Sequence, residues 1–230
     1  MVSGQVTLIT GASHGLGKAL ARAFARYCCP LVLCARESEP LELLRGELSA
    51  QGAQVVARPV DVSDGAQVSA LVHEGLQAFG RIDVLINNAA IGSPYGLLEK
   101  IEATEWDRVM AVNVRGPLLL AQAVVPSMRS QRFGRIINIT SNMGVLGSSN
   151  YGAYSVSKAA LNAQTRCLAA ELGGTGILVN GLDPGAFQSR MNPSSRLPAD
   201  TPVADALYLA SLGPDGPTGR FFRGCLDLGW

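Results

Sequence analysis

Short apolar segments alternate with longer amphipathic segments along almost the whole of this 230-residue chain. Segments such as 31–35 and 84–87 are apolar nearly throughout, which is typical of strands covered on both faces. The longer segments carry apolar residues at helical spacing; in residues 66–79 these are Val68, Leu71, Val72, Leu76 and Phe79. Strands that alternate with helices predict parallel βαβ units, and therefore an α/β fold: a doubly wound parallel sheet with helices on both faces.

The expected elements can be placed by residue number. The expected strands, about seven in all, are 6–10, 31–35, 54–60, 84–87, 135–140, 177–182 and 221–226. The expected helices are 17–27, 41–49, 66–79, 106–129, 154–172 and 201–212. No internal repeat, low-complexity tract or linker interrupts this series, so residues 1–230 are expected to form a single domain.

Polar or glycine-rich groups follow each of the first six expected strands. The carboxyl ends of parallel strands meet at one edge of the sheet, and the ligand crevice of such a sheet lies outside that edge. We therefore expect these groups to surround one site. In strand order they are the loop 11–17, Arg36, Asp61, Asn88, Ser141 and Asp183-Pro184-Gly185.

Composition excludes several other classes of function. The chain is 47% hydrophobic and 16% charged, with a net charge of +1 and no block of like charges, so it gives no support to nucleic-acid binding or to a membrane-surface role. No stretch approaches the roughly 18 uninterrupted apolar residues of a membrane helix, and the first residues do not resemble a signal peptide. The five cysteines show no metal-binding spacing and favour reduced thiols in a cytoplasmic protein.

Three glycines, Gly11, Gly15 and Gly17, lie between the first expected strand and helix. Glycines at this point let the backbone approach a pyrophosphate closely, while the helix N-terminus offers free N–H groups to it. The spacing is not that of a P-loop, because Ala12 and Ala19 stand where that motif needs Gly and a hydroxyl residue. It is not G-x-G-x-x-G either, because Leu20 follows the two spacers, and a glycine turn that only packs stays an alternative.

A phenol and an ammonium lie one helical turn apart at Tyr154 and Lys158, and Ser141 precedes them. Residues four apart share a helix face, so both side chains can enter one site. The tyrosine pKa is about 10, and a nearby cation lowers it. Lowering the pKa of Tyr154 to about 7 would require roughly 4 kcal/mol, which Lys158 and a cationic cofactor ring can supply together. The alternative is a partly buried Tyr beside a solvated Lys.

Taken together, these motifs resemble the short-chain dehydrogenase/reductase family, from about Val6 to Met191 and in the family's order. The resemblance implies a Rossmann-type fold and hydride transfer between a nicotinamide cofactor and a carbonyl or alcohol. The matching elements are Thr10-Gly-Ala-Ser-His-Gly-Leu-Gly17, Asn87-Asn88-Ala89, Asn113, Ser141, Tyr154-x-x-x-Lys158 and Pro184-Gly185, with Ser189 where the family usually has Thr.

The resemblance also implies roles for individual residues. Tyr154 would be the general acid in reduction, Lys158 would lower its pKa and bind the nicotinamide ribose, and Ser141 would orient the substrate oxygen. Asn113 would hold a water that links Lys158 to solvent. The remaining cofactor contacts fall on the glycine loop, the adenine side and the nicotinamide side: Gly11, Ser13, His14, Gly15, Leu16 and Gly17; Asp61, Val62, Asn88 and Ala89; Pro184, Gly185, Phe187 and Ser189.

The residue after the second expected strand indicates which cofactor binds. A carboxylate there would hold the adenosine ribose hydroxyls and favour NAD, but the chain has Ala35-Arg36. A guanidinium matches the geometry of a phosphate, so Arg36 can bind the 2′-phosphate of NADP(H), with His14 adding partial positive charge. We therefore expect NADP(H) as the cofactor and no metal. The alternative for Arg36 is a surface cation.

The chain departs from the family pattern at Ala90, where Gly is frequent, and at its end, which lacks the common Asp-Gly-Gly. It is more similar to carbonyl-reductase-type members with a short tail, and residues 186–212 form only a small segment to cover the substrate. Tyr151, Met143 and Leu146 are candidates to line the pocket, with core packing as the alternative for the last two. The family's habits imply a homo-oligomer, a dimer or tetramer.

Three other functions are alternatives to a carbonyl reductase. A regulatory module that binds the cofactor without turnover has no need of an activated phenol, so the complete Ser141, Tyr154, Lys158 and Asn113 set disfavours it. An enoyl reductase usually has a longer gap between Tyr and Lys. A sugar-nucleotide epimerase of the extended type is longer and has a different glycine spacing.

Overall fold

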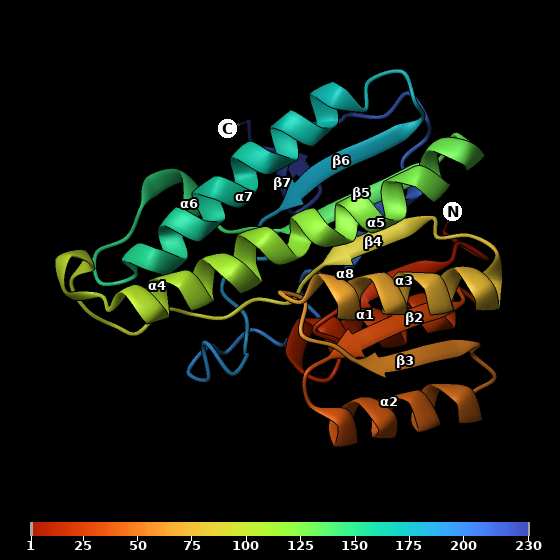
Figure 1. Cartoon of the computed structure of the whole chain (residues 1–230), viewed down its shortest axis with the longest axis horizontal. Helices are drawn as coiled ribbons and strands as arrows, with labels where there is room; N and C mark the ends of the chain where they lie inside the picture. The colour runs from red at the N-terminus through yellow and green to blue at the C-terminus, as the bar shows by residue number, and fades with distance from the viewer. Residues whose placement is uncertain (1, 230) are drawn as a thin grey trace.

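The computed structural model describes residues 2–229; Met1 and Trp230, the ends of the expected domain, lie outside the described residues. Its centre is one sheet in the order β3-β2-β1-β4-β5-β6-β7-β8 (Figure 1). The strands are β1 Thr7–Thr10, β2 Leu31–Ala35, β3 Val55–Pro59, β4 Val84–Asn87, β5 Gly134–Ile139, β6 Ile177–Leu182, β7 Phe221–Arg223 and β8 Leu226–Asp227. The first seven are parallel, so the predicted fold class is confirmed.

The end of the sheet differs from the prediction. Residues 221–226 were expected to form one last strand, but they fold into the antiparallel hairpin of β7 and β8, which makes eight strands. Gly224 and Cys225 at its tip both have φ of +59°. A two-residue hairpin turn with positive φ at both central positions matches the twist of the strands that it joins. This backbone reversal divides the expected strand in two.

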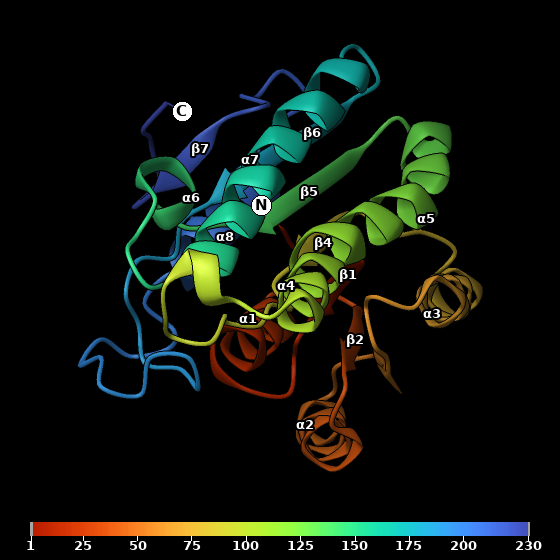
Figure 2. The same cartoon turned by 60° about the vertical axis from the view of Figure 1, so that its left-hand side comes forward.

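Helices cover both faces of the sheet (Figures 1 and 2). They are α1 Gly15–Arg26, α2 Ser38–Ala50, α3 Gly65–Phe79, α4 Ala103–Met110, α5 Gly116–Gln131, α6 Met143–Leu146, α7 Gly152–Glu171 and α8 Val203–Ser211. Helices α1, α2 and α8 pack in one apolar cluster, and α3, α5 and α7 in a second. Neighbouring strand residues contribute to opposite clusters, as Leu8 and Ile9 do, because successive side chains of a strand alternate between faces.

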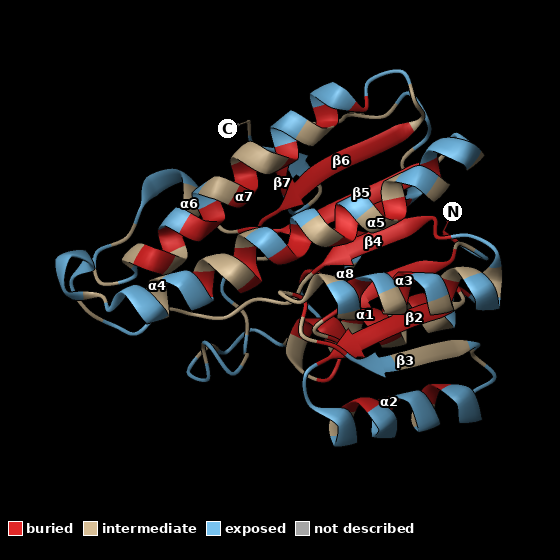
Figure 3. Ribbon diagram, in the orientation of Figure 1, coloured by how far each residue is buried: buried red, intermediate tan, exposed pale blue. Residues whose placement is uncertain are grey.

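Burial explains why the strands read as apolar runs. Every residue of β1, β2, β4, β5 and β6 is buried, whereas the edge strand β3 is half-buried or exposed (Figure 3). The strand order reverses direction between β1 and β4, which places a crevice at the carboxyl ends of these two strands. The site is therefore expected at this edge.

The expected helix 106–129 is not continuous α-helix. A π-helical turn, Ala111–Arg115, lies between α4 and α5 and contains Asn113. A π-turn inserts an extra residue into the helix and often marks a functional site. Here it carries Asn113 into the interior, where the residue is 1% exposed.

The helical run Ala103–Gln131 is the one helix, within the described residues, that is long and apolar enough by length and composition to cross a membrane. The sequence did not lead us to expect such a helix. In the fold, α5 packs on α3, β4 and β5, and its residues Leu120, Val124 and Met128 belong to the second apolar cluster. Core packing therefore accounts for its apolar face.

Candidate active site

Two adjoining hollows open at the carboxyl ends of the strands. The smaller, of about 410 Å³, is lined by the glycine loop and the ends of β2 and β3. The larger, of about 860 Å³, is lined by the ends of β5 and β6 and the start of α7. Both are lined by Asn88, Phe187 and Ser189, so they form one groove. Of the site residues predicted from the sequence, all but Gly17 and Asn113 line it.

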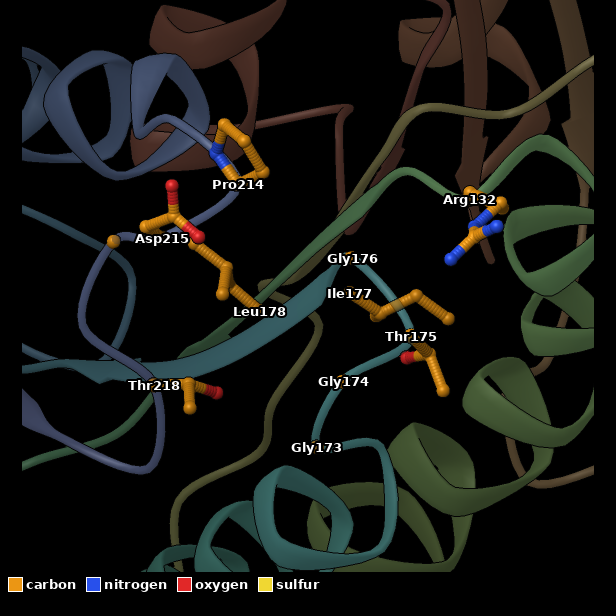
Figure 4. Close-up of a pocket in the computed structure, with 11 residues that line it drawn as sticks. Arg132, Gly173, Gly174, Thr175, Gly176, Ile177, Leu178, Pro214, Asp215 and Thr218 are labelled. Atoms are coloured by element: carbon orange, nitrogen blue, oxygen red, sulfur yellow. The ribbon is translucent and has the colours of Figure 1, made fainter.

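A third cavity, of about 510 Å³, lies at the opposite edge of the sheet. Figure 4 shows Arg132 and Asp215 on its two sides, with Ile177 and Leu178 of β6 between them. The loop 173–176 that precedes β6 also lines it. Ligands of open α/β sheets bind at the carboxyl ends of the strands, so we assign the candidate site to the groove and not to this cavity.

The glycine loop is folded tightly against its neighbours. A Cβ atom on Gly17 would lie 2.2 Å from the carbonyl oxygen of Gly11, and one on Gly11, where φ is +65°, would lie 2.9 Å from Nδ2 of Asn88. The helix that follows, α1, begins without a side-chain cap, because His14 makes no capping hydrogen bond. Its first N–H groups therefore fit an anionic pyrophosphate at the smaller hollow.

Asn88 fastens the end of β4 to the end of β1. Its Nδ2 donates to the carbonyl oxygen of Thr10 at 2.8 Å, and its backbone N–H donates to Oγ1 of Thr10 at 3.0 Å. The N–H of Ala89 donates to the same hydroxyl at 2.9 Å. These bonds fix the wall of the groove on which the resemblance places the adenine half of the cofactor.

One end of the smaller hollow, where the resemblance places the adenosine, is lined by Arg36, Asp61 and Val62. Oδ1 of Asp61 accepts hydrogen bonds from the N–H and the hydroxyl of Ser63, at 2.9 and 2.7 Å. These bonds from Ser63, and with a smaller effect the charge of Arg36, hold the pKa of Asp61 below its usual value. Asp61 is therefore an ionised acceptor that faces a cation across this end of the groove.

One cation at this end was not predicted from the sequence. Arg190 follows Ser189 and reaches Glu37, the residue after Arg36, and also His14 in the glycine loop. It lies 153 residues from Glu37 in the sequence, so residue spacing gave no signal for the contact.

The predicted pair Tyr154 and Lys158 projects from the first turns of α7 into the larger hollow. Nζ of Lys158 lies 5.6 Å from the centre of the Tyr154 ring and donates to the carbonyl oxygen of Ile139 at 2.7 Å. Lys158 is 3% exposed. Ser141 also lines the hollow, close enough to Tyr154 to lower its pKa, and its Oγ accepts from the N–H of Met143 at 3.2 Å. The structure thus brings the three predicted groups to one wall.

Burial changes the protonation of this pair from what the sequence suggested. Desolvation, aided by the charge of Asp183, raises the pKa of Tyr154 to about 12, although the hydrogen bond with Ser141 lowers it. Desolvation also lowers the pKa of Lys158 to about 8, against an opposing effect of Asp183. The lowering of the Tyr154 pKa toward 7 was expected from Lys158 together with a cationic cofactor ring. In the protein alone, desolvation and the charge of Asp183 dominate instead.

Asp183 at the end of β6 carries a buried charge behind the pair. It is 2% exposed, and its Oδ1 accepts from the N–H of Gly185 at 2.9 Å. Its Oδ2 accepts from Arg223 of β7, which also lines the larger hollow. Arg223 was not predicted as a site residue, because it lies within residues 221–226, which were expected to form a single strand.

Asn113 lies behind the groove and not on its surface. Its Oδ1 accepts from the N–H of Ile91 and its Nδ2 donates to the carbonyl oxygen of Ile91, both at 2.9 Å. Nδ2 also donates to Oγ of Ser157 at 3.0 Å, and that hydroxyl donates to the carbonyl oxygen of Tyr154 at 2.7 Å. Asn113 therefore ties the loop after β4 to the turn of α7 that carries Tyr154.

The segment after β6 covers the groove from the other side. Gly185 adopts φ of +67°, and Phe187 packs against the first apolar cluster while it lines both hollows. The N–H of Ser189 donates to the carbonyl oxygen of Asn192 at 3.2 Å. Residues 186–202, light blue in Figure 2, form an irregular loop before α8. Helix α8 begins at Val203, two residues later than predicted.

Two of the three candidate pocket residues line the larger hollow. Met143 and Tyr151 do so, and Tyr151 makes an edge-to-face contact with Tyr95 at 5.5 Å between ring centres. Leu146 does not, because α6 turns its side chain outward and leaves it 80% exposed.

Comparison with known proteins agrees with this architecture. The family model described as short chain dehydrogenase matches residues 5–199. The chain is 36% identical over 219 residues to the BbsD subunit of (2S)-[(R)-hydroxy(phenyl)methyl]succinyl-CoA dehydrogenase from Thauera aromatica, covering 95% of this chain and 85% of that one.

Two solved structures share the fold. A metagenomic short-chain oxidoreductase in complex with NADP superposes with a TM-score of 0.84 at 34% identity, covering 94% of both chains. The 3-ketoacyl-(acyl-carrier-protein) reductase from Brucella melitensis, complexed with NADH, superposes with a TM-score of 0.90 at 30% identity, covering 96% of this chain and 97% of that one. The family match spans the glycine loop, the Tyr154–Lys158 pair and the segment after β6, so this chain belongs to the short-chain dehydrogenase/reductase family.

Proposed function

We propose that the protein is an NADP(H)-dependent reductase of ketones or aldehydes. The observation that carries this proposal is the convergence of Tyr154, Lys158 and Ser141 on one wall of the groove formed at the strand ends. Membership of an oxidoreductase family supports the class of reaction. The carbonyl substrate and the choice of NADP(H) rest on the residues of the groove.

The protein groups divide the work of proton transfer. The phenol of Tyr154 donates the proton to the substrate oxygen, and Ser141 holds that oxygen by a hydrogen bond. The ammonium of Lys158 stabilises the negative charge left on Tyr154 and binds the nicotinamide ribose. Asn113 acts through the turn of α7 that it supports, and a water between Asn113 and Lys158 replenishes the proton. The bound cofactor supplies the hydride.

The protonation of the pair in the protein without cofactor suits proton donation during reduction. With its pKa near 12, Tyr154 keeps its proton at neutral pH, and Lys158, with its pKa near 8, is still charged there. A protonated tyrosine beside an ammonium is ready to donate to the alkoxide that forms on hydride addition, which is a far stronger base than phenolate. Oxidation of an alcohol would need the phenolate, which the cationic ring of the oxidised cofactor would favour.

The groove fits a nicotinamide dinucleotide along its whole length. The uncapped start of α1, the close glycine loop, Pro184, Gly185, Phe187 and Ser189 are the groups that would hold its pyrophosphate and nicotinamide. Arg36 at the adenosine end favours the 2′-phosphate of NADP(H). One similar structure holds NADP and another holds NADH. The proposal of NADP(H) therefore rests on the residues of this chain and not on its relatives.

The same proposal covers the domain organisation, the compartment, the oligomeric state and the partners of the enzyme. Residues 1–230 act as one dinucleotide-binding and catalytic domain in which residues 186–212 cover the substrate. The protein works in the cytoplasm as a homo-oligomer, a dimer or tetramer, and its partner is a small carbonyl or alcohol, without nucleic acid or membrane. The five unpaired cysteines within the described residues support a reducing compartment.

The test is oxidation of NADPH and of NADH in the presence of ketones, aldehydes and quinones. We expect turnover with at least one carbonyl and a lower KM for NADPH than for NADH. The variant Arg36→Ala should raise the KM for NADPH and leave that for NADH almost unchanged. A preference for NADH, or an unchanged KM for NADPH in Arg36→Ala, would contradict the cofactor assignment. NADPH binding without turnover across the panel would favour a regulatory protein of the same fold.

A further inference from the structure

Arg190 joins three segments at the adenosine end of the groove. It comes from the covering segment after β6, and its guanidinium donates from Nη1 and Nη2 to the two carboxylate oxygens of Glu37, the Nη2 bond being 3.2 Å long. Nη2 also lies 2.7 Å from Nε2 of His14, in the glycine loop. All three residues, with Arg36, line the smaller hollow. The covering segment is therefore fastened across the groove at the end where an adenosine 2′-phosphate would lie.

The contact between Arg190 and His14 shows that the second edge of the guanidinium can bind a hydrogen-bond acceptor. A guanidinium has donors only, so Nε2 of His14 must accept the hydrogen bond from Nη2. The other ring nitrogen, Nδ1, then carries the proton and donates to Oγ of Ser13, which lies 2.9 Å away. His14 is thus a hydrogen-bond acceptor in this arrangement, and it occupies a place where Arg190 can bind a negatively charged group.

The two edges of the Arg190 guanidinium have different partners. The edge formed by Nη1 and Nη2 is paired with Glu37. The edge formed by Nε and Nη2 is met only by the single ring nitrogen of His14 in the bonds above. Phosphate oxygens bind such an edge with two parallel N–H bonds and a full negative charge, which a single ring nitrogen does not match.

We propose that Arg190 is a second ligand of the NADP(H) 2′-phosphate, which takes the Nε and Nη2 edge in place of His14 while Glu37 keeps the other edge. Arg36 and Arg190 then hold the phosphate from two sides, and the charge of Glu37 stays neutralised by Arg190. Because Arg190 belongs to the covering segment, binding of the phosphate ties this already fastened segment directly to the cofactor. NAD(H), which has a hydroxyl at this position, leaves the edge to His14.

This inference rests on the proposed NADP(H) function, and a fragment of the cofactor separates the two. Adenosine 2′,5′-bisphosphate carries the 2′-phosphate, and 5′-AMP lacks it; neither carries nicotinamide, so binding does not depend on turnover. Calorimetric titration of the full chain would compare wild type, Arg190→Gln and Arg196→Gln. Arg196 is the matched control, since it lies exposed in the same segment and does not line the groove.

We expect wild type to bind the bisphosphate at least tenfold more tightly than 5′-AMP. Arg190→Gln should raise the Kd for the bisphosphate by about 10- to 100-fold, which is the scale of hydrogen bonds to charged groups. It should raise the Kd for 5′-AMP by less than threefold. Arg196→Gln should change neither by more than about twofold. If Arg190→Gln behaves like Arg196→Gln while wild type still prefers the bisphosphate, the proposed phosphate contact of Arg190 is wrong. The assignment of NADP(H) as the cofactor is then retained. If wild type binds both fragments alike, both proposals fall.

Attachment of the segment to the bound cofactor has its own readout. Hydrogen exchange of residues 186–202 should slow when NADPH saturates wild type, and much less when NADH does. In Arg190→Gln, saturating NADPH should protect the segment no more than NADH does. Equal protection by the two cofactors in wild type would contradict the coupling between the phosphate and the covering segment.

Discussion

The ammonium of Lys158 lies 5.6 Å from the centre of the Tyr154 ring, one turn further along α7, and it is buried with no carboxylate among its hydrogen-bond partners. Its one hydrogen bond among those described is to the carbonyl oxygen of Ile139. A buried cation without a paired anion is costly for the fold, so this arrangement is expected to lower stability in exchange for a charged group beside the phenol.

The stability cost of Lys158 can be measured. Its pKa falls from 10.5 to about 8 on folding, so between these values the unfolded chain binds more protons and stability rises with pH. Below about pH 8 the cost is fully present. We expect Lys158→Met to raise the free energy of unfolding at pH 7 by about 1–3 kcal/mol, with the gain vanishing toward pH 10. Urea unfolding at both pH values checks this, with exposed Lys100→Met as control.

The rate of carbonyl reduction should depend on the same titration. At saturating NADPH, kcat/KM for the carbonyl substrate is expected to fall as pH rises through about 8, because Lys158 loses its charge. Tyr154, with its pKa near 12, keeps its proton over this range and does not contribute. A rate that stays constant to pH 10 would show that the charge of Lys158 is not needed.

Arg223 is expected to stabilise the fold by pairing with the buried carboxylate of Asp183. Arg223→Met leaves the buried carboxylate without its cation, and we expect a loss of about 1–3 kcal/mol in the free energy of unfolding. The double variant Arg223→Met/Asp183→Asn should recover most of this loss. Arg220→Met is the control, because Arg220 and Asp227 form an exposed pair at 3.6 Å, which contributes at most about 0.5 kcal/mol. Equal effects of the two arginine variants would argue against this role of the pair.

The glycine loop offers a matched pair of variants. A methyl group on Gly17 would overlap the carbonyl of Gly11, so Gly17→Ala should displace the loop, weaken NADPH binding severely and cost about 1–3 kcal/mol of stability. Gly46 in α2 faces open space, so Gly46→Ala should stabilise the protein by about 0.5–1 kcal/mol and leave binding unchanged. Fluorescence titration with NADPH and urea unfolding give the two readouts.

The alternation of strands and helices predicted the fold, because a strand buried on both faces needs a continuous apolar run, as in β2 and β4. The hairpin of β7 and β8 was missed because it depends on positive φ at Gly224 and Cys225, which the apolar pattern does not record. The π-turn around Asn113 was missed for a similar reason, since its residues read as ordinary helix.

The site was predicted where its residues form short local motifs. Contacts between distant segments were not, and the pairs of Arg190 with Glu37 and of Arg223 with Asp183 are examples, 153 and 40 residues apart. The raised pKa of Tyr154 in the protein alone was not predicted, because sequence spacing shows a neighbouring charge but not the depth of burial. The predicted lowering also depends on the cationic cofactor ring and stays a prediction.

The central claim is that the phenol of Tyr154 gives its proton to the substrate, and Tyr154→Phe tests it most directly, because this change keeps the ring and removes the proton. For a carbonyl that wild type reduces, kcat should fall at least about 100-fold while the Kd for NADPH changes by less than about threefold. A Tyr154→Phe variant that retains full turnover with unchanged NADPH binding would contradict the account.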